Sequence, residues 1–475
     1  MTTVNSGRRG TMITAQKQRG SKRRMYRFPT IFAVCSALCL ASVPATAQVS
    51  FTSAVDLALR SDPRIKAAEA NVDKAKAVLK ETRDAVIPSV SATGGYGTST
   101  GVPLGVPVVF SLASQSLLFN FAQKDNERAA GAGLDAAMLA MRESRNVVAE
   151  DVVLSYLNLD NLQHKKLATD QEYDFANRLV TITQDRFDAG KDSKLELLKA
   201  RRTAAQIRLQ RLQLDDDIAI ASDHLARAIG LPGNKLSAVP GSVPALPSIT
   251  ALAADSNATE DSSGVQAAFA TAKSKQEVAF GQARYRFRPQ VSFGANYSRI
   301  NTSQTNYVDY YPGFKQKSLS AASIGVEIKI PLYDRGHEDQ AREAAADARH
   351  AQFEAQDQRN QFLEGRFRLQ HSANELSARS DLAEIDRDLA QGQLDAVLVQ
   401  LSADNGSSGG LLMTPKDAEN ARLQERARAI DLLDTQIQLL RVQVNLMRQT
   451  GQLDGWLKTA EIQASGASIE AGASH

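Results

Sequence analysis

The distribution of proline constrains the fold of this 475-residue chain more than any other feature. No proline occurs from 108 to 231, from 332 to 414, or after Pro415. Because proline costs about 3 kcal/mol in the interior of a helix, these stretches leave room for long helices. They are also rich in Ala, Leu, Gln, Glu, Arg and Asp. We therefore predict long helices over about residues 121–188, 193–229, 337–400 and 414–450.

The first predicted helix carries apolar residues at spacings of three, four and seven. They include Leu134, Met138, Met141, Val148, Val152, Leu159 and Leu162. This spacing is typical of the seam of a coiled coil. At 1.5 Å per residue the helix would be roughly 100 Å long, which is more than a compact domain needs. We expect it to pack against the second helix as an extended hairpin, with Gly190 at the turn.

Four short segments alternate between apolar and polar residues, at about 88–98, 107–118, 289–300 and 318–331. In the third segment Val291, Phe293, Ala295 and Tyr297 alternate with Gln290, Ser292, Gly294 and Asn296. In the fourth, Ile324, Val326, Ile328 and Ile330 alternate with Ser323, Gly325, Glu327 and Lys329. A period of two with one apolar and one polar face predicts β-strands. The chain is therefore expected to be mainly α-helical, with two pairs of strands.

An internal repeat organises these elements. Pro88, Val90, Ser91 and Tyr96 match Pro289, Val291, Ser292 and Tyr297 at an offset of 201, and Ala200, Arg201 and Gly230 match Ala421, Arg422 and Gly451 at an offset of 221. We predict two pseudo-repeats, 48–230 and 263–456, each with a helix, two strands and a long helical hairpin. Residues 231–262 would link them, and the Ala/Ser/Gly-rich tail 457–475 would be disordered.

Residues 1–47 have the composition of a cleaved signal peptide. They contain eight Lys or Arg and no Asp or Glu, then an apolar run from Ile31 to Val43 and an Ala-Thr-Ala pattern at the end. Both cysteines, Cys35 and Cys39, lie in this segment, so the mature chain is expected to hold no disulfide and no thiolate metal site. Without this segment acidic residues outnumber basic ones by five, which argues against a nucleic-acid partner.

Four amphipathic strands cannot close a barrel alone, because about eight are the practical minimum. An open sheet also leaves unpaired backbone groups, which lipid does not tolerate. We therefore predict a barrel shared between copies of the chain, with 8, 12 or 16 strands from two, three or four copies. Polar strand faces would line a wet lumen and apolar faces would meet lipid. The long helices would continue the barrel as an α-helical coiled-coil tunnel.

Several motifs in this order resemble the TolC family of outer-membrane efflux proteins. Gln115-Ser116-Leu117-Leu118-Phe119-Asn120 and Ile330-Pro331-Leu332-Tyr333-Asp334-Arg335-Gly336 resemble the two strand-to-helix junctions of that family. Arg186-Phe187-Asp188-Ala189-Gly190, followed by Leu195-Glu196-Leu197-Leu198-Lys199-Ala200-Arg201, resembles its first helical tip. The similarity covers about residues 51–456.

The resemblance implies a homotrimer with a 12-stranded barrel in the cell outer membrane and helices that project into the periplasm. It also implies an exit duct that opens at the periplasmic tip and receives small molecules or proteins from an inner-membrane pump and a periplasmic adaptor protein. Outer-membrane lipid would surround the barrel. A type I protein-secretion outlet is an alternative to a drug or metal efflux outlet.

Two residues are candidates for a pore constriction under this resemblance. Family members carry acidic residues just after the second helical tip, and Asp417 and Asn420 occupy those positions here. A ring of Asp417 carboxylates would focus a negative potential and favour cations. In the alternative interpretation, Asp417 merely stabilises the first turn of a helix, where the helix dipole favours an acid.

Three residues of the first tip, Arg186, Phe187 and Gly190, are candidates for contact with the adaptor protein. In the alternative interpretation, Gly190 supplies a left-handed helix cap and Phe187 packs in the seam. The second tip departs from the family pattern, because a Gly/Ser-rich stretch at 403–410 replaces an aromatic-x-x-Gly turn.

No catalytic constellation is visible in the sequence. The six histidines are scattered without metal-ligand spacing, and Asp215, Asp216 and Asp217 point in different directions on a helix. We therefore predict no enzyme activity, no metal and no cofactor. The main rival to a channel is a structural periplasmic coiled-coil protein without a pore.

Overall fold

The computed structural model describes residues 47–95, 108–249, 262–301, 318–403 and 413–472. The predicted signal peptide, apart from Ala47, and most of the predicted turn at 403–410 lie outside these ranges. The described residues form mainly helices with two small sheets.

Helices α2 (Phe51–Ser61) and α3 (Pro63–Asp84) precede strands β2 (Ser89–Gly94) and β3 (Val108–Asn120), which lead into α4 (Phe121–Asp188) and α5 (Lys194–Ala228). Further along come α7 (Ser263–Ala283), β5 (Gln290–Asn301), β6 (Ser318–Lys329), α9 (Arg335–Ala403), α10 (Pro415–Gln449) and α11 (Leu453–Gly472). The short strands β1 (Ala47–Val49) and β4 (Leu236–Ala238) pair in parallel.

The larger sheet is antiparallel, with strand order β2-β3-β5-β6, so β2 and β6 are its edges. The register places Phe293 opposite Val326 and Ala295 opposite Ile324, while Asn296 pairs with Ser323. Residues directly opposite share a face, so the sheet has one apolar and one polar face. On the apolar face Ile324 is 78% exposed.

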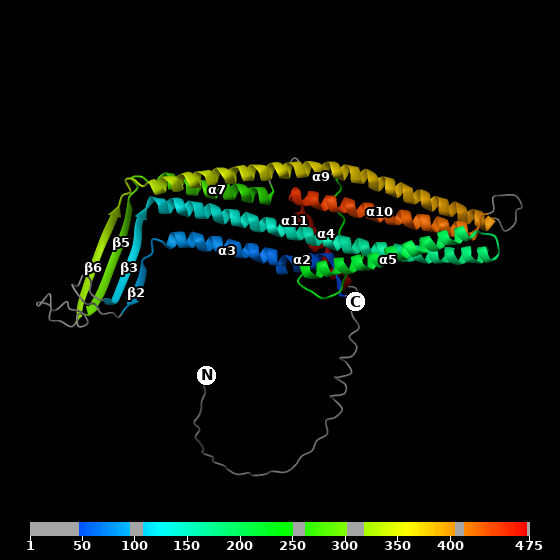
Figure 1. Cartoon of the computed structure of the whole chain (residues 1–475), viewed down its shortest axis with the longest axis horizontal. Helices are drawn as coiled ribbons and strands as arrows, with labels where there is room; N and C mark the ends of the chain where they lie inside the picture. The colour runs from blue at the N-terminus through cyan, green and yellow to red at the C-terminus, as the bar shows by residue number, and fades with distance from the viewer. Residues whose placement is uncertain (1–46, 96–107, 250–261, 302–317, 404–412, 473–475) are drawn as a thin grey trace, which may run out of the picture. The chain divides into compact units, whose positions relative to one another are not determined.

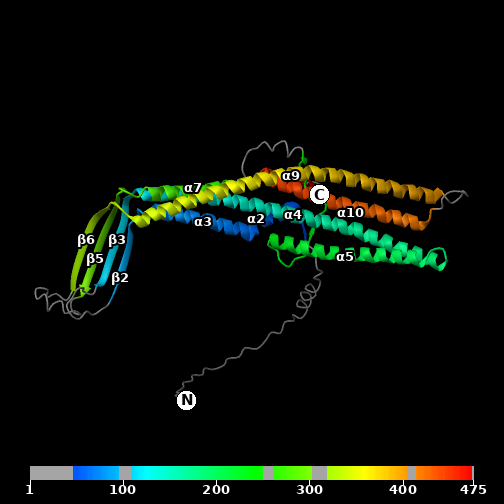
Figure 2. The same ribbon diagram turned by 45° about the horizontal axis from the view of Figure 1, so that its top comes forward.

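Local signals in the sequence set the starts of the helices. The side chain of Asn120 accepts a hydrogen bond from the amide of Ala122 at 2.9 Å, which caps α4 where β3 ends. Asp62 accepts from the amide of Arg64 at 2.7 Å, and Pro63 occupies the first position of α3. Such caps satisfy amides that have no partner within the helix. The sheet lies at one end of the long helices, and α4 and α9 end at the other (Figure 1; Figure 2).

The first part of α4 packs through small residues rather than through the predicted seam. Ala129, Ala132 and Ala136 are buried, whereas Met138 is 43% exposed. The Ser274 hydroxyl of α7 donates to the carbonyl of Ala129 at 2.8 Å, so the two helices lie very close together. Only small side chains permit such an approach. Met138 is therefore not buried within the single chain, while Val148, Val152 and Leu159 are buried as expected.

The main core surrounds Tyr156 in the middle of α4. Apolar residues from both ends of the sequence meet there, including Phe51, Val152, Leu225, Leu446, Met447 and Leu453. The Tyr156 hydroxyl donates to the Val49 carbonyl at 2.9 Å and accepts from the Val239 amide at 3.0 Å. It also lies 2.6 Å from the Ser242 hydroxyl. This single phenol links α4 to the segments that carry β1 and β4.

The end of the chain differs from the prediction of a disordered tail at 457–475. Helix α11 extends to Gly472, with Leu453, Leu457 and Ala460 buried. Trp456 donates its indole N–H to the carbonyl of Ala245 at 3.2 Å. The alanines that suggested low complexity favour a helix once one apolar face packs against the core.

We expect replacement of Tyr156 with Phe to lower the free energy of unfolding by roughly 1–3 kcal/mol, because the Val239 amide loses its acceptor in a buried setting. Denaturant unfolding followed by far-ultraviolet circular dichroism measures the effect. Tyr285→Phe is the control, because the Tyr285 hydroxyl bonds the Asp334 carbonyl at an exposed site. Equal effects of the two changes would show that the buried network adds no stability of its own.

Candidate functional site

A glycine in a left-handed conformation closes the first helical tip, between α4 and α5. The φ angle of Gly190 is 71°, which other residues rarely adopt. The Lys191 amide donates to the Arg186 carbonyl at 2.8 Å, and the Gly190 amide donates to the Phe187 carbonyl at 2.9 Å. These bonds satisfy carbonyl groups at the end of α4. The geometry of Gly190 therefore agrees with its interpretation as a left-handed helix cap.

Arg186 is bound within the same tip. Its guanidinium donates to the two oxygens of Asp192, at 3.1 Å from Nε and 3.2 Å from Nη2. The hydrogen bond to Asp192 raises the pKa of Arg186, and the same bond lowers the pKa of Asp192. Phe187 is half-buried. A bidentate ion pair between Arg186 and Asp192 thus stabilises the turn.

Asp417 lies in the first turn of helix α10, which leads away from the second tip. One carboxylate oxygen of Asp417 accepts from the Thr414 amide at 2.9 Å and from the Thr414 hydroxyl at 2.7 Å. Pro415 occupies the first turn. Asp417 therefore stabilises the start of α10, while Asn420 lies half-buried one turn further along. Both bonds are accepted by the same Asp417 oxygen, Oδ2.

Lys416 connects the two tips. Its Nζ lies 3.4 Å from Asp192 Oδ2 and 3.0 Å from Glu196 Oε2. Partial burial by itself would lower the pKa of Lys416, but its bond to Glu196 and the charge of Asp192 raise the pKa above its usual value. Lys199 and then Lys416 lower the pKa of Glu196. We call Arg186, Asp192, Glu196 and Lys416 the tip network.

The sequence predicted two members of this region, Arg186 and Asp417, but not the bridge between them. Lys416 is 224 residues from Asp192 and 220 residues from Glu196 in the sequence, and nothing in this spacing pairs them. One signal was available for Glu196, because Ser193 followed by an acid three residues later is a helix-start pattern. The Ser193 side chain indeed accepts from the Glu196 amide, at 3.3 Å.

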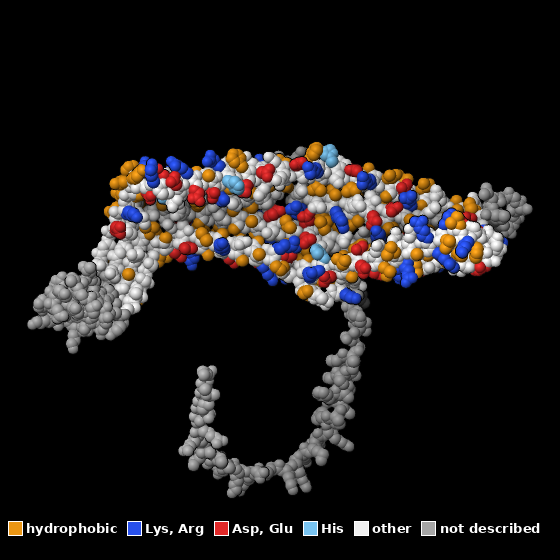
Figure 3. Space-filling view, viewed as in Figure 1, with side chains coloured by type: hydrophobic (Ala, Val, Ile, Leu, Met, Phe, Trp, Pro, Cys, Tyr) orange, Lys and Arg blue, Asp and Glu red, His pale blue; other side chains and the backbone are white. Residues whose placement is uncertain are grey.

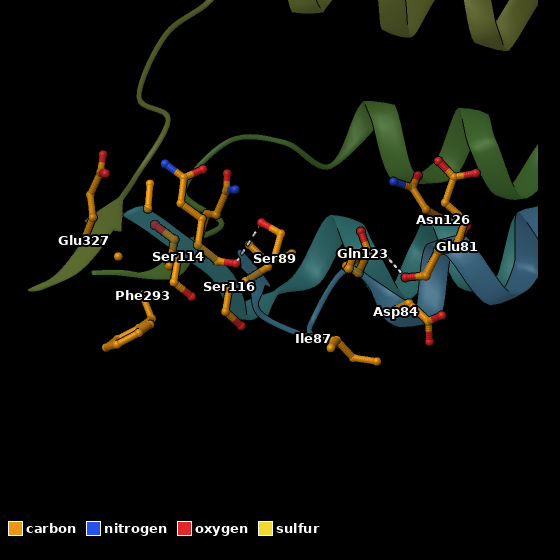
Figure 4. A pocket seen from close by; sticks show the side chains of 18 of the residues that line it. Glu81, Asp84, Ile87, Ser89, Ser114, Ser116, Gln123, Asn126, Phe293 and Glu327 are labelled. Atoms are coloured by element: carbon orange, nitrogen blue, oxygen red, sulfur yellow. Dashed lines mark hydrogen bonds between the residues drawn. The ribbon is translucent and has the colours of Figure 1, made fainter. Parts of the chain in front are cut away.

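The polar face of the sheet forms a second candidate region. It borders a hollow of about 2200 Å³, whose strand lining includes Ser292, Asn296, Ser298, Ser323 and Glu327. Figure 4 shows Glu327 and Phe293 pointing to opposite sides of the sheet, with Gln123 and Asn126 of α4 toward the helical end. We call this region the polar hollow. The strand lining combines uncharged hydroxyl and amide groups with apolar residues such as Phe293, Ile324 and Val326.

The acidic and histidine residues considered in the sequence make common side-chain contacts. Lys166 pairs with Asp215, and His224 lies 3.1 Å from the Ser155 hydroxyl. Within the described ranges no group of three or more His, Cys, Asp or Glu side chains is placed to hold a metal ion. None of the helices in those ranges combines the length and hydrophobicity that a membrane span requires.

Comparison with known proteins agrees with this geometry. Residues 54–231 match the family model described as outer membrane efflux protein. No curated protein sequence matches the chain significantly. The resemblance to the TolC-like outer-membrane efflux proteins predicted from the sequence is confirmed.

Solved structures share the fold. The outer membrane protein VceC from Vibrio cholerae has 17% sequence identity and a TM-score of 0.66, with 84% of this chain and 96% of that chain covered. The CmeC outer membrane channel from Campylobacter jejuni has 16% identity and a TM-score of 0.64, with 86% and 89% covered. The open-state MtrE outer membrane channel from Neisseria gonorrhoeae has 15% identity and a TM-score of 0.60, with 85% and 89% covered.

Replacing Lys416 with Gln should loosen the tips, because both ion pairs across them are lost. We expect amide hydrogen exchange in residues 186–197 to accelerate roughly two- to fivefold at neutral pH, as measured by mass spectrometry. The lowered carboxyl pKa values of Asp192 and Glu196 mean that their contribution is complete above the ordinary carboxyl range. It is lost as the pH falls through the lowered values, so the variant and wild type should converge in acid.

Lys199→Gln is the matched control for this measurement. It removes a surface pair with Glu196, at 2.9 Å, but leaves the bridge to Lys416 in place. If Lys199→Gln accelerates exchange as much as Lys416→Gln does, the bridge between the tips has no special role.

Proposed function

We propose that this chain, which resembles the TolC-like family of outer-membrane efflux proteins, is one subunit of a homotrimeric channel in the cell outer membrane. The channel is the exit duct of a tripartite export system and passes small molecules or proteins to the outside. An inner-membrane pump and a periplasmic adaptor protein deliver the substrate. The helices project into the periplasm.

The sheet is the observation that carries this proposal. Its apolar face is exposed, with Val326 at 60% and Ile328 at 64%, and in the part of the chain that the structure describes each edge strand has a partner on one side only. Unpaired backbone is costly in lipid, so β2 of one copy is expected to pair with β6 of the next. Three copies supply 12 strands, the number that the family resemblance implies. The polar hollow then faces the lumen.

Two long helices carry apolar faces that no other described element of the chain covers. On α5 the exposed residues are Leu195, Leu198, Leu209 and Leu212, and on α9 they are Phe353, Phe367, Leu382, Ile385 and Leu389. Large exposed apolar stripes are typical of protein interfaces. We assign them to contacts between neighbouring subunits, which would close the helices into a tunnel.

The two tips form the periplasmic entrance in this proposal. The ion pairs of Lys416 connect the start of α10 to the first tip, so breaking these ion pairs is a route to opening the entrance. Asp417, beside these ion pairs, contributes one carboxylate per subunit to a ring at the constriction, with Asn420 one turn deeper. The outer side of the first tip, with Arg186, Phe187 and Gly190, receives the adaptor.

A change of charge alone tests the constriction. Asp417→Asn keeps an oxygen that can accept from the Thr414 amide but removes the negative charge. We expect wild-type channels in a planar bilayer to be cation-selective. The variant should lose roughly half or more of that selectivity, measured as a shift in reversal potential in a salt gradient.

Asp73→Asn is the control for this experiment, because Asp73 lies exposed on α3. Unchanged selectivity in Asp417→Asn would place the constriction elsewhere. A membrane-inserted oligomer with no conductance would remove the channel, and failure to insert would favour a pore-free periplasmic coiled coil.

Because the ion pairs of Lys416 with Asp192 and Glu196 hold the two tips together, their removal is predicted to increase conductance. Lys416→Gln should raise the single-channel conductance or the open probability of the reconstituted channel by roughly twofold or more, because the entrance is less constrained. Lys199→Gln should behave like the wild type. A Lys416→Gln channel that opens no more often than the wild type would mean that other contacts hold the entrance.

A further inference from the structure

A basic hollow of about 670 Å³ lies where the helices meet the sheet. Its charged lining consists of Arg83, Lys124, Arg128 and Arg288, with Asp125 and Glu127 as the acids. We call it the junction hollow. Four cations against two carboxylates leave it with a positive charge. All of these residues belong to one chain, so the hollow does not depend on assembly.

A buried carboxylate positions two of the four cations. The side chain of Asp125 is 3% exposed and forms ion pairs with Arg128 and, at 2.5 Å, with Arg288. Gly281 of α7 makes room for this arrangement, since a Cβ atom there would lie 2.9 Å from the Asp125 Cβ. Both guanidinium groups are thus fixed, and each retains N–H donors beyond those that bind Asp125.

The remaining two cations are more accessible. Arg83 pairs with Glu127 at 2.7 Å, and both side chains are substantially exposed. Lys124 is exposed and makes no ion pair among the described residues. A surface pair such as Arg83 with Glu127 is weak, so a stronger anion can compete for the arginine.

An apolar path leads from the junction hollow onto the sheet. Phe121 lines the hollow and packs edge-on against Phe119, with 4.8 Å between the ring centroids. The register places Phe119 opposite Val291 and Val291 opposite Ile328, which is on the exposed apolar face. Figure 3 shows basic and hydrophobic side chains together where the helices meet the sheet.

The junction hollow and the polar hollow lie on different faces of α4. Gln123, Asn126 and Ala130 border the polar hollow, whereas Lys124, Arg128 and Gly131 border the junction hollow. The junction hollow therefore opens on the side of the apolar strand face, away from the proposed lumen.

We propose that the junction hollow binds the phosphate group of an anionic phospholipid, whose acyl chains lie along Phe121, Phe119 and the apolar face of the sheet. Arginine forks match phosphate oxygens, and Lys124 supplies a further charge. Basic pockets beside membrane-embedded surfaces bind lipid headgroups in this way. The inference rests on the proposed outer-membrane location and adds a specific lipid contact to it. A free phosphate ion would satisfy the basic groups but would leave the apolar path uncovered.

Native mass spectrometry of the purified full-length oligomer in nonionic detergent tests this inference, with dioleoylphosphatidylglycerol as the probe. Wild type should bind it in preference to uncharged dioleoylglycerol, and excess inorganic phosphate should not displace it. The double variant Arg83→Gln with Lys124→Gln should raise the apparent Kd for the probe by about tenfold or more.

The matched control is Arg60→Gln with Lys66→Gln. Arg60 also belongs to an exposed pair, with Asp56, and Lys66 is exposed on α3 away from the hollow. This control should bind the probe within about twofold of wild type. Equal binding of the two lipids, or equal weakening in both double variants, would overturn the proposal. Displacement of the probe by inorganic phosphate would overturn the lipid proposal, because it would show that the junction hollow binds only a phosphate ion.

Planar-bilayer conductance on the same preparations separates this inference from the channel itself. Conducting oligomers without lipid preference would overturn the lipid site and leave the channel intact. Selective binding of phosphatidylglycerol in detergent, weakened only in the junction variant, would support the site even if no conductance were found.

Discussion

The fold depends on a sheet that cannot satisfy its own backbone. Strand β3 pairs with both β2 and β5, and β5 pairs with β6, but no other strand among the described residues pairs with the outer sides of β2 and β6. Together with the exposed apolar face, these edges make the isolated chain an incomplete unit. The exposed stripes on α5 and α9 suggest the same for the helices. The proposed self-association would complete backbone pairing and apolar burial at once.

Helix packing is divided between two kinds of contact. Near the sheet, α4 meets α7 through alanines and glycines, and a Cβ atom added to Gly133 would lie 3.4 Å from the Ser274 hydroxyl oxygen. Further along, larger residues such as Tyr156 and Leu159 fill a core that α2, α5 and α10 share. A second apolar cluster, which includes Leu179, Ile207 and Leu423, lies toward the tips, and the ion pairs of the tip network are added there. The contacts thus change from close backbone approach to packing of larger side chains, with ion pairs added near the end of the same helix.

The sequence predicted the helices and strands well, because proline and glycine punctuate it clearly and the strand alternation is strong. Gly190 ends its helix as expected. The differences have physical reasons. Met138 is exposed on the single chain because α4 packs there through alanines, and the tail continues as helix α11 because composition alone hides the apolar residues that pack against the core. The Lys416 bridge depends on two turns that meet only after folding, so no local pattern reveals it.

The phenol of Tyr156 also has a consequence for the order of folding. Its partners are Val49, Val239 and Ser242, and Phe51 beside it packs edge-on against Trp456 with 5.4 Å between the ring centroids. The contacts around this one side chain therefore join segments separated by hundreds of residues. Contacts of such long range form slowly, because loop closure must precede them. The central core would then be completed only after almost the whole chain is available, with the helical hairpins able to form earlier.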